Sequence, residues 1–197
     1  MSSLYTIGYT AFSDLNIFTD VLKSHDISVL IDVRSVPKSK YYIDYDSDLL
    51  DKELKKSDII YRNYATEFGA RQVDFLDDKI KCVNFENFIN SKQFKDGIEK
   101  VEKIQSKGRN IAFMCAEKDP ITCHRSIMVG KGLLDDNFQI NHIMTDKTIK
   151  TQQEITNILL EKYKNDLNDF LNPIIDPIKY VYLQQNKKIG FTINEEE

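Results

Sequence analysis

The sequence lacks several features that would place it in a common protein class. Its 197 residues contain no apolar run of eighteen residues, the length that a membrane-spanning helix needs. The segment from Met1 to Tyr5 has neither the basic start nor the apolar stretch of a secretion signal. No Gly-x-Gly-x-x-Gly and no Walker sequence occurs, which argues against the common dinucleotide and nucleoside triphosphate loops. We therefore expect a cytoplasmic protein without membrane association.

Cysteine and arginine are both scarce. The chain has three cysteines, and two of them, Cys115 and Cys123, share one short segment, which suits a reducing compartment better than a disulfide framework. Lysine is the default cation, and arginine differs from it by a planar fork that binds carboxylate or phosphate through two hydrogen bonds. The positions of arginine are therefore informative. The five arginines are Arg34, Arg62, Arg71, Arg109 and Arg125.

The overall charge is weakly acidic. The net charge is −4 and the isoelectric point is near 5.5. Broad, sequence-independent DNA binding depends on many phosphate contacts, so this charge argues against it. The apolar fraction of 41% is enough for the core of one domain.

Apolar strand-like runs alternate with helical patterns along most of the chain. This order predicts βαβ units and a mainly parallel sheet. We expect a three-layer αβα domain of about five strands over residues 1–171. The predicted strands are 4–9, 29–31, 59–61, 111–114 and 138–143. The predicted helices include 14–24, with Ser13 as its cap, and 48–56, 94–104 and 151–171.

The tail has a different pattern. Pro173 and Pro177 interrupt the alternation. Two apolar runs, 180–183 and 189–193, flank a short polar segment and predict a β-hairpin. We expect residues 172–197 to form a hairpin extension packed on the main domain.

The most informative stretch is residues 110–125. The apolar strand ends at Cys115, a polar loop follows, and Cys123, His124 and Arg125 begin a helix. In parallel sheets, ligand sites lie beyond the carboxyl ends of the strands. A helix N-terminus also attracts anions and lowers the pKa of a thiol.

Several other polar residues follow the predicted strands and therefore share this edge of the sheet. A thiol supplies a nucleophile or a redox group, an imidazole exchanges protons near neutral pH, and arginines hold an anion. The candidate catalytic residues are Cys115, Cys123, His124, Asp32 and Glu117. The candidate substrate-binding residues are Arg34, Arg71, Arg125, Tyr9, Thr10, Lys38 and Tyr61.

Each of these residues also has an ordinary structural interpretation. Cys115 is equally interpretable as a small buried apolar side chain. Asp32 and Arg34 are two apart on a strand, so they share a face and can pair with each other. Arg125 can pair with Glu117 in the same way, without any catalysis.

Metal binding is a further alternative. Cys115, Cys123, His124 and His142 together offer four ligands. Zinc sites favour short spacings such as Cys-x-x-Cys, and the gap between Cys115 and Cys123 is longer. We therefore expect no metal and no cofactor.

Four motifs in this order resemble those of one family. They are Thr6-Ile7-Gly8-Tyr9, Ile31-Asp32-Val33-Arg34-Ser35, Phe68-Gly69-Ala70-Arg71, and Cys115-Ala116-Glu117 followed by Cys123-His124-Arg125. The chain resembles the family catalogued as domain of unknown function 488 from about residue 4 to residue 150. The resemblance implies an α/β cytoplasmic protein and does not imply a reaction.

Three hypotheses of function follow. The first is a thiol-dependent hydrolase or transferase with an Arg/Cys/His anion-binding cleft, acting on a phosphorylated or nucleotide-type substrate. The second is a non-catalytic binding module for a nucleic-acid or nucleotide ligand. The third is an interaction protein that uses the tail hairpin as a pairing edge. The expected partners are an anionic small molecule or a nucleic-acid fragment, and a homodimer is compatible with the added tail.

Overall fold

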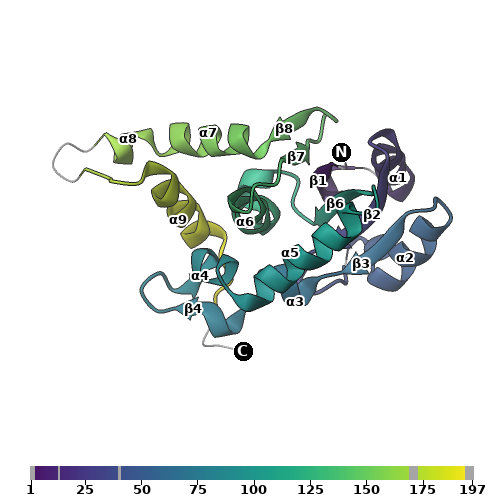
Figure 1. The fold of residues 1–197 in the computed structure, drawn as a ribbon, viewed down its shortest axis with the longest axis horizontal. Helices are drawn as coiled ribbons and strands as arrows, with labels where there is room; N and C mark the ends of the chain where they lie inside the picture. The colour runs from purple at the N-terminus through teal and green to yellow at the C-terminus, as the bar shows by residue number, and fades with distance from the viewer. Residues whose placement is uncertain (1–2, 13, 40, 169–172, 194–197) are drawn as a thin grey trace.

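A six-stranded sheet forms the centre of the molecule (Figure 1). The computed structural model describes residues 3–12, 14–39, 41–168 and 173–193. The strand order is β3-β2-β6-β1-β7-β8; the first five strands are parallel, and β8 is antiparallel to β7. The strands are β1 (Leu4–Gly8), β2 (Ile27–Asp32), β3 (Ile60–Asn63), β6 (Asn110–Cys115), β7 (Ile140–Ile143) and β8 (Ile149–Thr151). The predicted mainly parallel α/β fold is confirmed.

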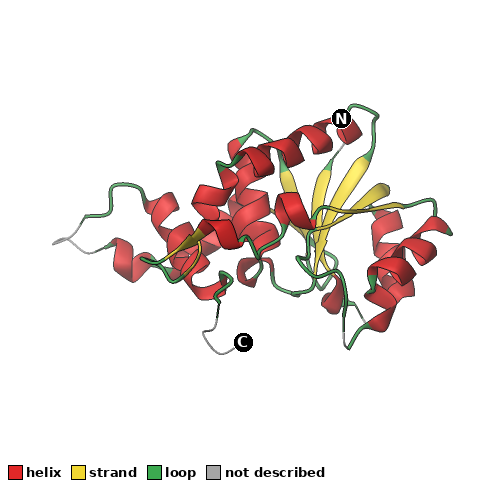
Figure 2. Ribbon diagram, turned by 90° about the horizontal axis from the view of Figure 1, so that it is seen from below, coloured by secondary structure: helices red, strands yellow, loops and turns green. Residues whose placement is uncertain are grey.

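The central strands are apolar on both faces because helices cover both sides of the sheet (Figure 2). Alternate residues of β2 and β6 point into two different cores. Leu30 and Met114 belong to one core, and Ile31 and Phe113 belong to the other. This double burial explains why the sequence shows continuous apolar runs rather than alternation.

Helices α1 (Leu15–Ser24) and α2 (Ser47–Lys55) cover one face of the sheet. Helix α1 begins at Asp14, whose side chain accepts a hydrogen bond from the Ile17 amide at 2.9 Å. Ser13, the predicted cap of this helix, lies outside the described residues.

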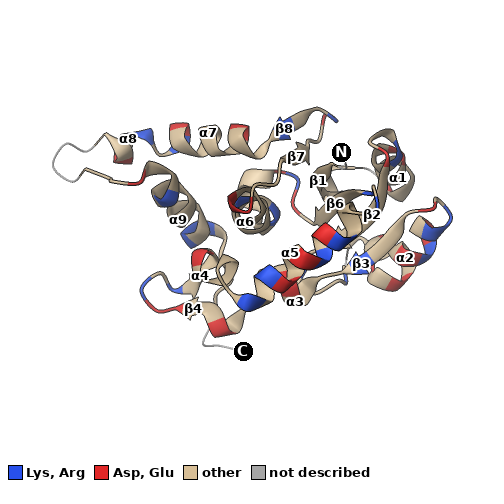
Figure 3. Ribbon diagram, in the orientation of Figure 1, with Lys and Arg blue, Asp and Glu red and all other residues tan. Residues whose placement is uncertain are grey.

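The other face carries a longer set of elements. Helix α5 (Lys92–Gln105) begins at the Ser91 cap and contains the predicted helix 94–104, and its outer surface carries both charge signs (Figure 3). The segment after Cys123 forms η5 (Arg125–Gly130), a π-helix, followed by α6 (Lys131–Asp135). Before α5 the chain also forms a small antiparallel sheet, which the sequence did not predict. The preceding elements are α3 (Ala65–Phe68), β4 (Leu76–Asp77), β5 (Cys82–Val83) and α4 (Phe85–Ile89).

The chain direction changes between β1 and β6. From β1 the chain passes through α1, on one face, to β2; from β6 it passes through η5 and α6, on the other face, to β7. Strands β1 and β6 are neighbours. Such a reversal of connection direction opens a crevice at the carboxyl ends of the two strands, where α/β proteins bind ligands.

The predicted C-terminal hairpin is wrong, because the tail forms a helix, α9 (Pro177–Ile189). The Asp176 side chain caps this helix through the Lys179 amide, and Pro177 occupies its first turn. Val181, Tyr182, Gln185 and Asn186 are buried, at helical spacing. Two aromatic and β-branched residues in a row resemble a strand locally, but tertiary burial at a helical period determines the structure.

Helix α9 lies between α7 (Gln152–Lys162) and α4 (Figure 1). The predicted helix 151–171 is divided into α7 and the short α8 (Lys164–Leu167), and its end, 169–171, lies outside the described residues. The proposed boundary between residues 171 and 172 falls in the same gap. None of the helices in the described ranges has the length and apolarity to cross a bilayer.

Candidate functional site

The candidate site lies where β1 and β6 end side by side. Gly8, the last residue of β1, pairs with Cys115, the last residue of β6. A Cβ at Gly8 would overlap the Glu117 carbonyl group, so the two main chains approach at a point that only glycine allows. The Thr10 amide and hydroxyl both donate to the Ala116 carbonyl, at 3.2 and 2.6 Å. These contacts fix the loop that follows β6.

Four predicted catalytic residues meet in this loop and the start of the next helix. The Cys115 and Cys123 sulfurs lie 3.0 and 2.9 Å from Glu117 Oε2. His124 Nδ1 lies 3.6 Å from the Cys115 sulfur and 4.0 Å from the Cys123 sulfur. We call these four residues the thiol cluster.

Three of the four residues of the thiol cluster are buried. Cys115, Cys123 and His124 are 3%, 0% and 8% exposed. Glu117 is an exposed residue, yet its carboxyl group contacts both sulfurs. Glu117 therefore connects the buried thiols to the surface of the protein.

The electrostatics of the cluster separate the two thiols. Burial acts to raise the pKa of Cys123, but a hydrogen bond from Cys115 and the charges of Arg125 and His124 hold that pKa well below its ordinary value. The hydrogen bond to Cys123 and burial raise the pKa of Cys115 well above its ordinary value. These opposite shifts favour the thiolate at Cys123 and the protonated thiol at Cys115.

The pKa values of Glu117 and His124 are shifted by burial and by their contact with Cys123. Burial and the charge of Cys123 raise the pKa of Glu117. Burial acts to lower the pKa of His124, but the hydrogen bond and charge of Cys123 outweigh it and raise that pKa. Both shifts favour the protonated forms of Glu117 and His124 beside the Cys123 sulfur, and proton exchange by such groups is the basis of acid/base chemistry.

The His124 ring is held in one orientation. Its Nε2 lies 2.9 Å from the Val33 carbonyl oxygen, just beyond the end of β2. Nε2 therefore donates to this carbonyl, and Nδ1 faces the two sulfurs.

Arg125 lies inside the protein rather than at a ligand surface. It is fully buried, and its guanidinium donates to the carbonyls of Glu117 and Lys118 at 2.6 and 3.1 Å. Its Nε has no hydrogen-bond partner among the described residues. Arg125 thus holds the loop that carries Glu117 and places a positive charge beside Cys123.

Asp32 and Arg34 form a second buried group, separate from the thiol cluster. The Arg34 guanidinium donates to both Asp32 oxygens and to the Tyr45 carbonyl, and the Tyr61 hydroxyl donates to Asp32 Oδ2 at 2.7 Å. Arg34 also lies over the Tyr9 ring, 5.2 Å from its centroid. Asp32, Arg34, Tyr61 and Tyr9 are all less than 10% exposed.

The remaining predicted binding residues are exposed. Lys38 lies on the loop after β2. The amide of Arg71 donates to the Ser35 hydroxyl, and its guanidinium lies over the Phe191 ring, 5.1 Å from the centroid.

A groove of about 580 Å³ opens beside the Glu117 loop. It lies between that loop, the turn after β7, and α7. Its lining combines two lysines with apolar side chains, and its acidic groups are engaged locally: Asp119 binds the Ile121 amide, and Asp146 binds Thr148. The lining residues are Lys118, Asp119, Ile121, Met144, Thr145, Asp146, Thr148, Lys150, Ile155 and Ile158.

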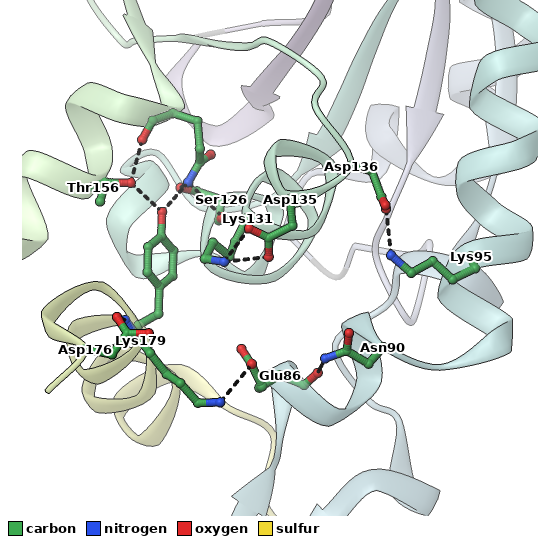
Figure 4. Close-up of polar contacts among 12 residues, drawn as sticks. Glu86, Asn90, Lys95, Ser126, Lys131, Asp135, Asp136, Thr156, Asp176 and Lys179 are labelled. Carbon is green, nitrogen blue, oxygen red and sulfur yellow. Dashed lines mark hydrogen bonds and ion pairs between the residues drawn. The ribbon is translucent and has the colours of Figure 1, made fainter.

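Sequence reasoning missed a buried polar network behind the cluster. His142 on β7 accepts a hydrogen bond from the Thr6 hydroxyl and donates to Gln152 Oε1, both at 2.7 Å. Gln152 Nε2 donates to the Ser126 carbonyl and the Tyr182 hydroxyl. The Tyr182 hydroxyl also bonds to Thr156 at 2.8 Å (Figure 4). No local signal in the sequence connects positions this far apart.

Gly8 and Gln185 also support the site. The glycine that ends a predicted strand was a usable signal, because glycine often marks close backbone approach. Gln185 lies on α9, where its Nε2 donates to the Ile121 carbonyl in the loop before Cys123 at 2.6 Å. The incorrect hairpin prediction for the tail concealed this contact.

Comparison with known proteins places the chain in a family. No curated protein matches its sequence. The family model for the domain of unknown function DUF488 matches residues 14–131, more than half of the chain, including Asp32, Arg34 and the whole thiol cluster. The chain therefore belongs to the DUF488 family.

Proposed function

We propose that the protein is a thiol-dependent hydrolase or transferase that acts on a phosphorylated or nucleotide-type substrate. The observation that carries this proposal is the convergence of two thiols, an imidazole and a carboxyl group at the carboxyl ends of β1 and β6, beside a groove with two lysines.

The groove supports an anionic substrate. Lys118 and Lys150 supply positive charge, and Ile155 and Ile158 supply an apolar wall. This combination suits a molecule with a phosphate at one end and a flat apolar part at the other. Arg34 and Arg125 act indirectly, because their guanidinium groups are engaged by protein oxygen atoms.

The thiol cluster supports chemistry rather than binding alone. The pKa of the buried Cys123 is held well below its ordinary value, and the pKa values of Glu117 and His124 beside it are raised. Such perturbed protonation is concentrated at catalytic sites. Glu117 is the group that faces solvent and can exchange its proton there.

The test is hydrolysis of simple phosphate esters and nucleotides by the purified full chain. The panel contains p-nitrophenyl phosphate, bis(p-nitrophenyl) phosphate and the nucleoside mono- and diphosphates. We expect the double variant Cys115→Ala, Cys123→Ala to lose at least about 100-fold in kcat/KM, the range of a lost acid/base system. Lys118→Ala with Lys150→Ala is expected to raise KM mainly.

The chain provides its own control, the third cysteine. Cys82 is buried beside Asn186, away from the cluster. Activity that falls in Cys82→Ala as much as in the double variant, or that survives in the double variant, would exclude thiol-dependent chemistry at this site. Nucleotide binding without turnover would favour the binding module instead.

A further inference from the structure

We propose that Cys115, Cys123 and His124 bind a zinc ion, with the Glu117 carboxylate at the fourth, solvent-facing position. The inference deepens the proposed function and rests on it for the catalytic role of the site, whereas metal binding itself is measurable without any substrate.

The distances between the candidate ligand atoms are close to those around a tetrahedral zinc ion. The Cys115 and Cys123 sulfurs and His124 Nδ1 all lie within 4.8 Å of one another. A tetrahedral zinc with Zn–S bonds of about 2.3 Å and Zn–N bonds of about 2.1 Å separates its ligand atoms by roughly 3.3–3.8 Å. The distances from Nδ1 to the sulfurs are 3.6 and 4.0 Å, and those from Glu117 Oε2 are 3.0 and 2.9 Å. Small side-chain rotations therefore suffice to form the site.

The donor atoms are of the kinds that bind zinc. Two thiolates and an imidazole are soft or borderline ligands, which select zinc over the hard cations magnesium and calcium. The fold brings these donors together from the end of β6 and the start of the following helix. A seven-residue gap can therefore replace the short Cys-x-x-Cys spacing, since the loop folds back on itself.

Hydrogen bonds from neighbouring groups orient the candidate ligands. A metal-binding histidine commonly donates its other ring N–H to a carbonyl or carboxylate. His124 Nε2 does so to the Val33 carbonyl at 2.9 Å, so once the ring has lost its Nδ1 proton to bind a metal, its lone pair is on Nδ1. The Arg125 amide points at the Cys123 sulfur, at 3.4 Å.

The exposure of one ligand, Glu117, indicates a reactive metal site rather than a structural one. Structural zinc sites have four closed protein ligands, whereas catalytic sites leave one position open to water or substrate. Three of the ligands here are buried, and Glu117 alone is an exposed residue. Its neighbour Lys118 lines the groove. A substrate in the groove would thus reach the metal by displacing one carboxylate.

The experiment measures metal on the reduced full chain. Zinc is added, excess is removed, and bound zinc is measured by mass spectrometry. Cobalt is then substituted for zinc and its absorption recorded. We expect about one zinc per chain, together with the visible bands of tetrahedral cobalt and a near-ultraviolet sulfur-to-cobalt charge-transfer band.

Matched variants assign the ligands. Cys115→Ser, Cys123→Ser and His124→Gln are each expected to weaken zinc binding by more than the roughly 10–100-fold that loss of an outer-shell partner costs. Cys82→Ser is expected to bind as the unchanged protein does. Circular dichroism verifies the fold of each variant. If a variant does not fold, the cobalt spectrum of the unchanged chain still tests the metal site.

The outcomes separate this inference from the proposed function. A folded, reduced chain that binds no zinc, or a Cys115→Ser, Cys123→Ser variant that binds it normally, overturns the metal site. Zinc binding with the expected ligands but no activity on any phosphorylated compound supports the metal site and overturns the proposed function. Thiol-dependent activity without bound metal does the reverse.

Discussion

Gly8 is the residue at which the site tolerates least change. A Cβ here would meet the Glu117 carbonyl, a main-chain group that Arg125 and the Thr10–Ala116 contacts hold in place. We expect Gly8→Ala to lower the free energy of unfolding by about 1–3 kcal/mol, the usual cost of forcing extra atoms into a packed region. Displacement of the loop should also increase alkylation of Cys115 and Cys123. Urea unfolding and peptide mass spectrometry measure the two effects.

Gly108→Ala is the matched control for that substitution. Gly108 has a positive φ of 73° and open space around its Cα, so alanine there encounters backbone strain but no neighbour. Its cysteine reactivity should be that of the unchanged protein. Equal reactivity in Gly8→Ala would show that the close approach does not hold the thiol loop.

At the residue scale, the sequence predicted which side chains gather and did not reveal their partners. Cys115, Glu117, Cys123 and His124 were predicted to share one sheet edge, and they do meet. Arg34 and Arg125 were predicted to bind substrate, and in the structure both engage protein oxygen atoms. Whether a guanidinium faces a ligand or a backbone carbonyl depends on loop geometry, which residue type alone does not determine.

Among the elements, helix α9 supports the site although it lies far from Cys115 and Cys123 in the sequence. Its Tyr182 hydroxyl accepts from Gln152 Nε2 and bonds to Thr156, both at 2.8 Å, inside the buried network. Tyr182→Phe removes both of these buried hydrogen bonds, and Gln152 Nε2 and the Thr156 hydroxyl keep only their bonds to the Ser126 and Gln152 carbonyls. We expect a loss of about 1–3 kcal/mol in the free energy of unfolding, measured by urea denaturation.

Tyr180→Phe is the control on the same helix. The Tyr180 hydroxyl bonds to Asp166 at 3.3 Å on the exposed side, and loss of such a surface bond costs little. If the two variants lost equal stability, the cost would belong to the helix in general and not to the buried network.

The elements differ in how well their sequences specify them. The apolar strands β2 and β6 and the helix α5 were predicted, because apolar runs and helical periodicity are local signals. Strands β4 and β5 have two residues each and β8 has three, which is too short for a period to appear. The hairpin prediction for α9 failed because the buried face of that helix is defined by its contacts with other helices, α7 and the distant α4, and not by its local sequence.

For the whole molecule, His142 links stability to pH. Burial lowers the pKa of His142 to about 3, whereas in the unfolded chain it is near the ordinary value of about 6.5. Between these values the unfolded chain binds a proton that the folded protein does not, so stability falls as pH falls. The expected loss from this residue is about 2 kcal/mol between about pH 7 and about pH 5.

Urea unfolding at several pH values measures this dependence. A His142→Gln variant starts from lower stability, because the Thr6 and Gln152 contacts change, but it lacks the titrating group. Its stability should therefore vary less between the two pH values. An identical pH dependence in both proteins would show that His142 is not the group responsible.

The position of β1 at the centre of the sheet has a consequence for synthesis on the ribosome. Leu4 pairs with Ile111 on one side and Ile140 on the other, so β1 has no neighbour until synthesis has reached β6. Folding of such long-range pairings is slow, and the growing chain exposes an unpaired strand edge meanwhile. Cys115 is the last residue of β6, so it emerges as that wait ends, and Cys123 follows after the short polar loop.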